Sequence, residues 1–207
     1  TTGFLTRVPD TSATLLRDSY GAQFVKNIFA ATAQTQKIIF DIIQNEKIEC
    51  DFIPCDSYYS AYKDGDEVLL SEWEGVAQAD PCAKLVTGGQ LQKAGLPFKQ
   101  AIEYAAEGKF HSRKYILALL ALMQTKGLRV FEESEVLDVQ IGPQVILKTA
   151  HGTVKADKLA VAMGNPMSLF PELAVLVEPL ISYVIATRFN TPPLSNDLFW
   201  DTSDPYF

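Results

Sequence analysis

Few side chains in this 207-residue sequence could carry out a reaction without a cofactor. Histidine occurs only at His111 and His151, and the cysteines are Cys50, Cys55 and Cys82. Two cysteines separated by four residues, with two histidines elsewhere, form a poor zinc pattern, so we expect no metal site. An odd number of cysteines without repeated spacing indicates reduced thiols, which predicts a cytoplasmic protein.

Other residues are suited to binding an anionic substrate. A guanidinium group and phenol groups match a carboxylate, which makes Arg188, Tyr58, Tyr59 and Tyr104 candidates to hold one. The alternative for each tyrosine is packing on a half-buried sheet, and the sequence leaves both interpretations open.

A dinucleotide fingerprint is missing from the sequence. A pyrophosphate site needs a strand, a glycine-rich turn and a helix N-terminus. No G-x-G-x-x-G motif occurs, and Gly88-Gly89 follows no convincing strand.

The composition excludes several classes of protein. Hydrophobic residues make up 47% and charged residues 21%, which is typical of a folded globular chain. A formal net charge of −7 argues against a nucleic-acid surface. No apolar run is long enough to span a bilayer, so we expect no membrane partner.

The elements that must position the candidate residues are both helices and strands. A long helical region is predicted from Ser12 to Asn45, with a break or kink at Gly21. A second helix is predicted after Asp66, which suits an N-cap. Strands are predicted at residues 48–52, 57–63, 98–104, 180–189 and from 198 onward. We expect the second, third and fourth of these strands to share one mainly antiparallel sheet.

A central block begins at Phe110-His111-Ser112-Arg113-Lys114-Tyr115. Ser112 suits an N-cap, and apolar residues at helical spacing predict a helix to Lys126. Short strands are predicted at 128–131, 136–139, 145–149 and 154–156, followed by a buried strand over 158–164. We expect the helix to pack, through Ile116 and Leu120, on a sheet that contains the last of these strands.

This block resembles the middle of the glycine oxidase and D-amino-acid oxidase superfamily of FAD-dependent oxidoreductases. Many members have a phrase like HP-x-K-Y, a helix, G-x-x-x-x-E-x-x-x-V, a hairpin and a strand closing on A-x-G-N/A. The match here runs over residues 110–166, with Ser112 where proline is common. Gly3-Phe4-Leu5-Thr6 and Ile48-Glu49-Cys50-Asp51-Phe52 are similar to two further family segments, so the resemblance covers nearly the whole chain.

The resemblance implies an α/β fold of mixed α+β type, with part of an FAD-binding domain interleaved with an antiparallel substrate-domain sheet. Residues 1–52 and 110–166 would belong to the FAD-type domain, and residues 53–109 and 167–207 to the substrate-side sheet. In the family the glycine-rich fingerprint lies upstream of the matched segments. We therefore expect a central portion of a longer flavoenzyme, with a naturally short homologue as the alternative.

The resemblance also assigns residues to the flavin end of the site. Thr2 and Gly3 match the loop that passes beside the flavin, and His111 lies near the flavin face or the substrate mouth. His111, Arg188 and Tyr58 are the candidate catalytic residues. The alternatives are a terminal loop for Thr2 and Gly3, and a surface or capping role for His111.

Further positions match the other end of the cofactor. Val136 matches the position whose backbone meets the adenine, although its side chain would be core in either case. Ala162, Met163 and Gly164 match the strand end near the diphosphate, where a glycine lets the backbone approach closely. The alternative for these three residues is a simple strand-to-loop turn.

By the resemblance, the expected function is FAD-dependent oxidation of a C–N bond in an amine or amino acid, with the protein orienting the substrate and excluding water. One alternative is a cofactor-free binding or interaction module on the same scaffold. Another is the flavin domain of a tRNA-modifying enzyme, for which Lys99, Lys109, Arg113 and Lys114 would form a thin basic cluster. The expected partner is a small-molecule amine or amino acid, without nucleic acid, and a homo-oligomer is possible.

Overall fold

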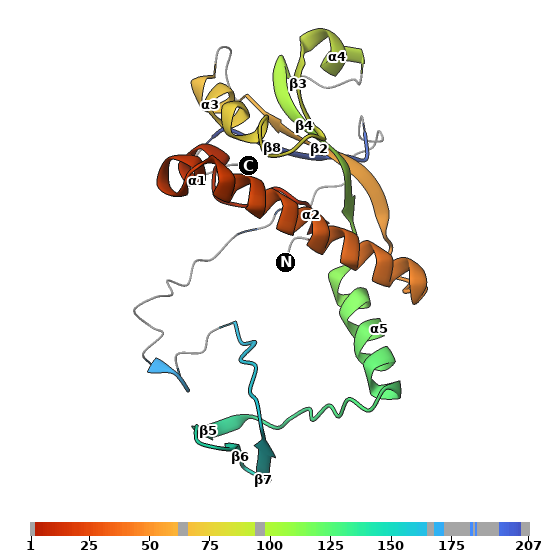
Figure 1. Ribbon diagram of the computed structural model, residues 1–207. Coiled ribbons are helices and arrows are strands. Elements are labelled where there is room, and N and C mark those ends of the chain that lie inside the picture. Colours follow the sequence, from red (N-terminus) through yellow and green to blue (C-terminus); the bar gives the residue numbers. More distant parts are fainter. Residues whose placement is uncertain are drawn as a thin grey trace. The chain divides into compact units, whose positions relative to one another are not determined.

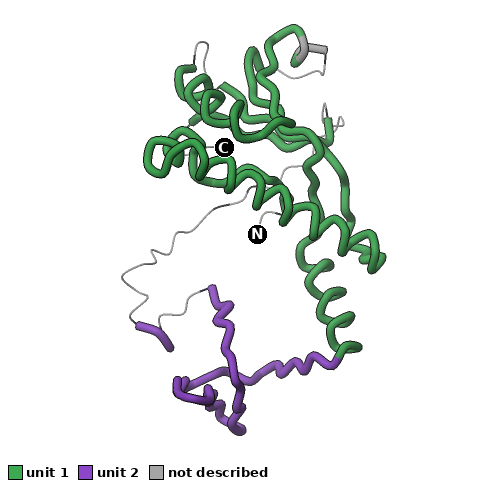
Figure 2. Tube along the Cα trace, viewed as in Figure 1, with its two compact units in different colours: residues 1–126, 189–207 green, residues 127–188 purple. Residues whose placement is uncertain are grey.

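The structure is a computed structural model that describes residues 3–61, 66–93, 98–164, 168–171, 183, 185 and 195–203. The chain divides into two compact units (Figure 2). Unit 1 contains residues 1–126 and 189–207, and unit 2 contains residues 127–188. The two units are described separately below. The assignment of ranges to an FAD-type domain and a substrate-side domain remains a prediction.

Two helices open unit 1, α1 (Ala13–Tyr20) and α2 (Ala22–Asn45), and they are separated by Gly21 as predicted. Gly21 has φ 86°, a conformation that residues with a Cβ rarely adopt, and its N–H donates to the carbonyl of Arg17 at 2.7 Å. One residue therefore ends α1 and redirects the chain into α2.

Within the described residues, the sheet of unit 1 has five strands: β1 (Phe4–Leu5), β2 (Ile53–Ser60), β3 (Ala83–Thr87), β4 (Gln100–Lys109) and β8 (Leu198–Asp201). The long strand β4 pairs antiparallel with β1, β2 and β3, and β8 pairs parallel with β2. Tyr58 lies opposite Glu103 in this register. The predicted antiparallel pairing of 57–63 with 98–104 is therefore confirmed for residues 57–60 and 101–104. The predicted strand 180–189 lies outside the described residues, apart from positions 183 and 185.

Three further helices belong to unit 1: α3 (Glu67–Val76), α4 (Gly88–Lys93) and α5 (Ser112–Thr125). The Asp66 carboxylate accepts from the N–H groups of Val68 and Leu69, which confirms its predicted role as the N-cap of α3. The cap of α5 is His111 rather than the predicted Ser112, because the His111 imidazole accepts from the N–H of Lys114.

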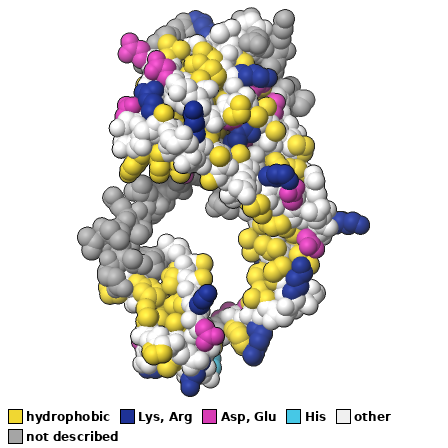
Figure 3. All heavy atoms as spheres, in the orientation of Figure 1, with side chains coloured by type: hydrophobic (Ala, Val, Ile, Leu, Met, Phe, Trp, Pro, Cys, Tyr) yellow, Lys and Arg dark blue, Asp and Glu magenta, His cyan; other side chains and the backbone are white. Residues whose placement is uncertain are grey.

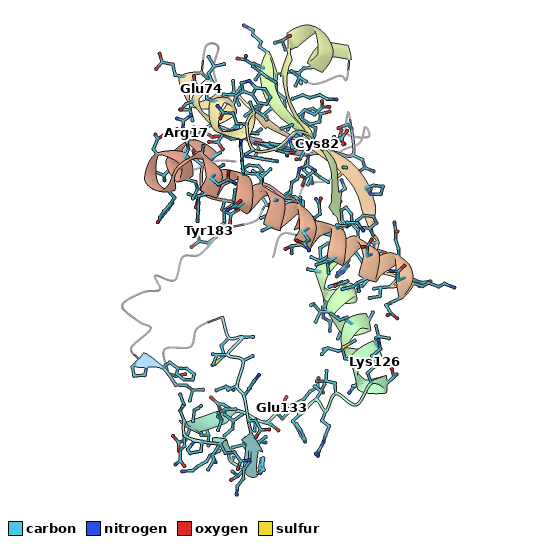
Figure 4. The ribbon with its side chains drawn as sticks, in the orientation of Figure 1. Arg17, Glu74, Cys82, Lys126, Glu133 and Tyr183 are labelled. Carbon is cyan, nitrogen blue, oxygen red and sulfur yellow. The ribbon has the colours of Figure 1, made fainter. Side chains whose placement is uncertain are left out.

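Helices α1, α2 and α3 cover one face of the sheet (Figure 1). The buried core there contains Ala13, Val25, Phe29, Leu69, Val76, Ala83, Ile102 and Tyr104. Arg17 of α1 lies 3.8 Å from the carboxylate of Glu74 of α3, at the edge of this core (Figure 4). On the opposite face of the sheet, a smaller core contains Tyr58, Val86, Leu91 and Ala101.

Unit 2 contains the strands β5 (Val136–Gln140), β6 (Val145–Thr149) and β7 (Gly152–Ala156). They form an antiparallel meander in sequence order, which confirms the three predicted strands. Among the described residues of this unit, Val145 is the buried hydrophobic side chain.

Several sequence predictions are wrong. Residues 48–52 form no strand, because the N–H of Ile48 returns to the carbonyl of Ile43 and Asp51 has a positive φ of 52°. Residues 128–131 and 158–164 also lack strand pairing, and Met163 is 45% exposed. The strand near 159–163 on which α5 was predicted to pack therefore does not form. Ile116 of α5 is 50% exposed, and hydrophobic side chains are visible along this helix in Figure 3.

Candidate functional site

The candidate site is an open cavity of about 420 Å³ in unit 1. Seven residues from three separate stretches of chain line it: Gly3, Phe4, Asp51, Lys109, Phe110, His111 and Ser112. Two of the predicted flavin-end residues, Gly3 and His111, are therefore brought together although they are more than 100 residues apart in the sequence.

A small hydrophobic core holds the three stretches in place. It contains Leu5 of β1, Ile43 of α2, Ile48 and Cys50 of the following loop, and Tyr115 of α5. Two backbone hydrogen bonds also join the stretches to one another. Phe110 N–H donates to the Gly3 carbonyl at 2.9 Å, and His111 N–H donates to the Cys50 carbonyl at 2.7 Å. Phe110 also packs edge-on against Tyr115, with ring centroids 5.3 Å apart. Hydrogen bonds and side-chain packing thus hold the three lining stretches next to one another.

Gly3 occupies a position that excludes a side chain. Its φ is 81°, and a Cβ built on it would stand 2.6 Å from the carbonyl oxygen of Phe110. The missing Cβ therefore makes room for the main chain of Phe110, and Gly3 lines the cavity with backbone atoms alone.

His111 caps α5 with one of its two ring nitrogens. Its Nδ1 accepts from the N–H of Lys114 at 3.4 Å, so the proton of the neutral imidazole is at Nε2. Nε2 has no hydrogen-bond partner among the described residues. The side chain thus caps α5 with one nitrogen and can donate a hydrogen bond with the other.

The charged residues around the cavity are paired. Lys114 Nζ lies 2.7 and 2.9 Å from the two carboxylate oxygens of Asp51, and this hydrogen bond holds the pKa of Asp51 below its usual value. Lys109 Nζ donates to the carbonyl and to the side-chain oxygen of Asn196. Asp51, Lys109 and Ser112 were not predicted as site residues. The signal in the sequence was that Asp51 and Ser112 lie within the matched segments 48–52 and 110–115, and that Lys109 directly precedes the second.

Tyr58 lies on the sheet, apart from this cavity lining. Its hydroxyl donates to Glu103 at 3.0 Å, and its ring stacks on Phe199 with centroids 5.5 Å apart. Burial, followed by the bond to Glu103, raises the pKa of Tyr58. Burial raises the pKa of Tyr59 to about 12, and Tyr104 is 1% exposed in the core beneath the helices. Tyr104 therefore has the packing role that was its alternative.

The remaining predicted site residues belong to unit 2 or lie outside the described part of the chain. Val136 and the run Ala162–Gly164 belong to unit 2, where a Cβ on Gly164 would meet nothing within 4 Å. Thr2 and Arg188 are outside the described residues.

In the described segments, no three His, Cys, Asp or Glu residues gather as a metal site would require. None of the helices in that part of the chain has the length and apolar content needed to cross a membrane.

Known proteins share this sequence pattern and fold. The family model of FAD dependent oxidoreductases matches residues 9–207. The putative Rieske 2Fe-2S iron-sulfur protein YhfW of Bacillus subtilis (strain 168) is 26% identical over 135 residues, which cover 64% of this chain and 26% of that protein.

Solved structures show the same fold at low sequence identity. Glycine oxidase from Geobacillus kaustophilus matches 75% of this chain and 42% of its own, with a TM-score of 0.54 and 16% identity. L-amino acid deaminase from Proteus vulgaris matches 81% of this chain and 38% of its own, with a TM-score of 0.56 and 14% identity. The chain thus spans less than half the length of each of these three proteins. Since the family model extends over nearly all of the sequence, the chain belongs to the FAD-dependent oxidoreductase family and has its mixed α/β fold.

Proposed function

We propose that this chain is the central part of a longer enzyme that oxidises a C–N bond of an amine or amino acid. The observation that carries the proposal is the cavity between Gly3 and His111, set in a fold shared with a glycine oxidase and an L-amino acid deaminase. Both relatives act on amino acids, as their names state, and the family is FAD dependent.

The cavity fits one end of the cofactor. Small-molecule sites have volumes of roughly 300–1,000 Å³, and about 420 Å³ accommodates a ring system but not a whole dinucleotide. Gly3 lines the cavity with main chain alone, which suits contact with a planar ring. His111 Nε2–H supplies a donor for a ring oxygen or nitrogen. Thr2 and Gly3 are accordingly our candidates for the flavin contact.

We assign the other end of the cofactor to unit 2. Val136 is our candidate for the adenine contact, and Ala162, Met163 and Gly164 are candidates for the diphosphate. Gly164 has open space where a Cβ would stand, so its backbone is accessible to a phosphate. FAD, when bound, supplies the two-electron acceptor for the C–H next to the substrate nitrogen.

The residues of the chain orient the substrate and exclude water in this proposal. Arg188 and Tyr58 are the candidates to hold the substrate, and His111 the candidate beside the flavin. The reaction removes two electrons and two protons from the CH–NH unit and gives an imine, whose hydrolysis releases ammonia from a primary amine. This oxidation needs no side-chain nucleophile.

The test uses the full-length product of the natural gene. The expected results are one FAD per chain after denaturation and bleaching of the flavin by at least one member of an anaerobic panel of amines and amino acids. Ammonia should appear in proportion to the flavin reduced by primary amines. An FAD-containing protein that no amine reduces would overturn the C–N assignment. A protein purified without flavin, and unable to bind it, would favour the cofactor-free binding module.

The same preparation tests the electron acceptor. The Bacillus subtilis relative is named as a putative Rieske 2Fe-2S iron-sulfur protein. We propose such a cluster, in a segment outside this chain, as the acceptor of electrons from the flavin. Each cluster accepts one electron, so one of the two electrons from the flavin should make a Rieske-type electron paramagnetic resonance signal appear in the full-length protein, and an added one-electron acceptor should take up the second. Stoichiometric hydrogen peroxide without such a signal would identify dioxygen as the acceptor instead.

A further inference from the structure

Three buried charged residues form a cluster where the segment after β1 contacts β4. Its members are Arg7, Asp80 and Glu107, which are 6%, 5% and 1% exposed. Burying one cation with two carboxylates is costly, because charges lose their hydration in the interior. None of these residues belongs to the cavity described above, and nothing in the proposed reaction requires them.

Arg7 is held by contacts from several elements. Its Nε lies 2.7 Å from Asp80, its Nη1 donates to the carbonyl of Ala105 at 2.7 Å, and its backbone N–H lies 3.2 and 3.3 Å from the two Glu107 oxygens. On the other side, the Thr32 hydroxyl of α2 donates to the Arg7 carbonyl. Arg7 Nη2 is buried and has no partner within the described residues. These contacts join the Arg7 segment to β4 and to α2.

The same segment carries Gly3. Phe4 and Leu5 of β1 pair with Lys109 and Gly108 of β4, so Glu107 is the next residue along that strand. Gln36 of α2 donates to the carbonyl of Leu5 at 2.6 Å. The contacts of Arg7 add a buried charged anchor to these hydrogen bonds and to the one from Phe110 N–H to the Gly3 carbonyl.

We propose that Arg7, Asp80 and Glu107 form a proton-binding clasp that positions the Gly3 segment, and that the clasp is tightest when it has taken up one proton. With both carboxylates ionised, the cluster carries a net charge of −1 in a buried place. One proton on Glu107 makes it neutral, and the other carboxyl oxygen can still accept from Arg7 N–H. Arg7 and Glu107 are positioning residues in this view, since neither lines the cavity.

The groups facing Glu107 agree with this assignment. Burial is the largest influence and raises the pKa of Glu107 to about 7, against the opposing effects of the hydrogen bond and charge of Arg7. Asp80 and Asp56 raise it further. Cys55 of β2 lies opposite Glu107 in the sheet, while Thr32 and Gln36 of α2 are uncharged.

Hydrogen exchange of residues 3–9 in the full-length protein tests the clasp without relying on flavin. The pKa of Glu107 is about 7 in the closed clasp and 4.5 in an open one. The equilibrium constant for opening should therefore rise roughly twenty-fold between pH 5.5 and 7.5 and level off above pH 7.5. Glu107→Gln, which is neutral at every pH, should abolish this rise. Glu72→Gln is the matched control, because Glu72 is also buried (8% exposed) but contacts residues 12–14.

Two outcomes of this experiment would overturn the clasp. One is that the protection of residues 3–9 from hydrogen exchange in the wild type does not change between pH 5.5 and 7.5, after correction for intrinsic exchange. This result needs no variant, so it would overturn the clasp even if Glu107→Gln does not fold. The other is a pH dependence that Glu107→Gln leaves unchanged.

A second measurement, FAD retention during gel filtration at the two pH values, rests on the proposed function. Retention should fall with pH in the wild type and in Glu72→Gln, and not in Glu107→Gln. A pH-dependent clasp with pH-independent retention would show that the Gly3 segment does not contact the flavin, which separates failure of the proposed site from failure of the clasp.

Discussion

The carbonyl oxygen of Phe110 lies 2.6 Å from the point at which a Cβ on Gly3 would stand. Main chain from the first strand and main chain from the start of α5 are thus in direct contact at the candidate site. The Phe110 N–H also donates to the Gly3 carbonyl, so a hydrogen bond joins the two segments.

Gly3→Ala should destabilise the chain. The new methyl group would meet Phe110 backbone, and φ 81° is a strained conformation for alanine, so we expect a loss of about 1–3 kcal/mol in the free energy of unfolding. Urea denaturation measures it. Gly89→Ala is the control, because a Cβ there meets nothing within 4 Å and the residue lies in helix α4. Equal stability of the two variants would contradict the close approach.

His111 variants should separate capping from ligand binding. His111→Asn keeps a good N-cap side chain, whereas His111→Ala removes the cap and should cost about 0.5–2 kcal/mol of stability. His111→Ala removes every side-chain donor, and His111→Asn leaves an amide N–H that is too short to reach the position of Nε2, so both should weaken FAD binding to the full-length protein. An Asn variant with unchanged FAD affinity would leave His111 with its capping role alone.

The free energy of unfolding should depend on pH through Glu107. Its pKa is raised from 4.5 to about 7, so the folded state binds the proton more tightly than the unfolded state. The contribution of Glu107 to the free energy of unfolding is therefore fully present below about pH 4.5 and is lost as the pH rises to about 7. At about 1.4 kcal/mol per pKa unit, the loss from this group is about 3 kcal/mol. Glu107→Gln should be more stable than wild type at pH 7.5, and urea midpoints at pH 5 and 7.5 check this.

Tyr58→Phe tests whether the phenol binds substrate or only packs. A hydrogen bond to a charged ligand contributes roughly 1.5–3 kcal/mol, so loss of such a contact should raise KM at least tenfold while FAD content stays constant. The hydroxyl also donates to Glu103, and losing that bond should cost about 1 kcal/mol of stability. A variant with reduced stability and unchanged KM would support the packing interpretation.

This 207-residue chain by itself should not hold FAD tightly. Its candidate contacts are backbone groups and one imidazole, and no glycine-rich fingerprint is present for the pyrophosphate. Each missing charge-assisted hydrogen bond removes roughly 1.5–3 kcal/mol, or one to two powers of ten in affinity. Flavin absorbance after gel filtration of the chain mixed with FAD measures retention. A stoichiometric yellow protein would contradict the expectation.

Local features of the fold were predictable from the sequence because their causes lie within a few residues. The break at Gly21 follows from a backbone conformation that favours glycine, and the Asp66 cap from a carboxylate that reaches the next two free N–H groups. The strands β5, β6 and β7 followed from short β-rich runs separated by turn residues. The family resemblance rests on the same kind of local motif, and it brought Gly3 and His111 into one predicted site.

Only the tertiary structure decided what depends on distant partners. Residues 48–52 have strand-like composition, yet their backbone bonds to the end of α2 and to His111. His111 became the cap of α5 because its own backbone N–H is held by Cys50, which sets the direction in which the chain enters the helix. Arg7 and Glu107 are 100 residues apart, and nothing in either local sequence indicates a partner. Their contact exists because β1 and β4 pair in one register, and that register is fixed by packing across the whole of unit 1.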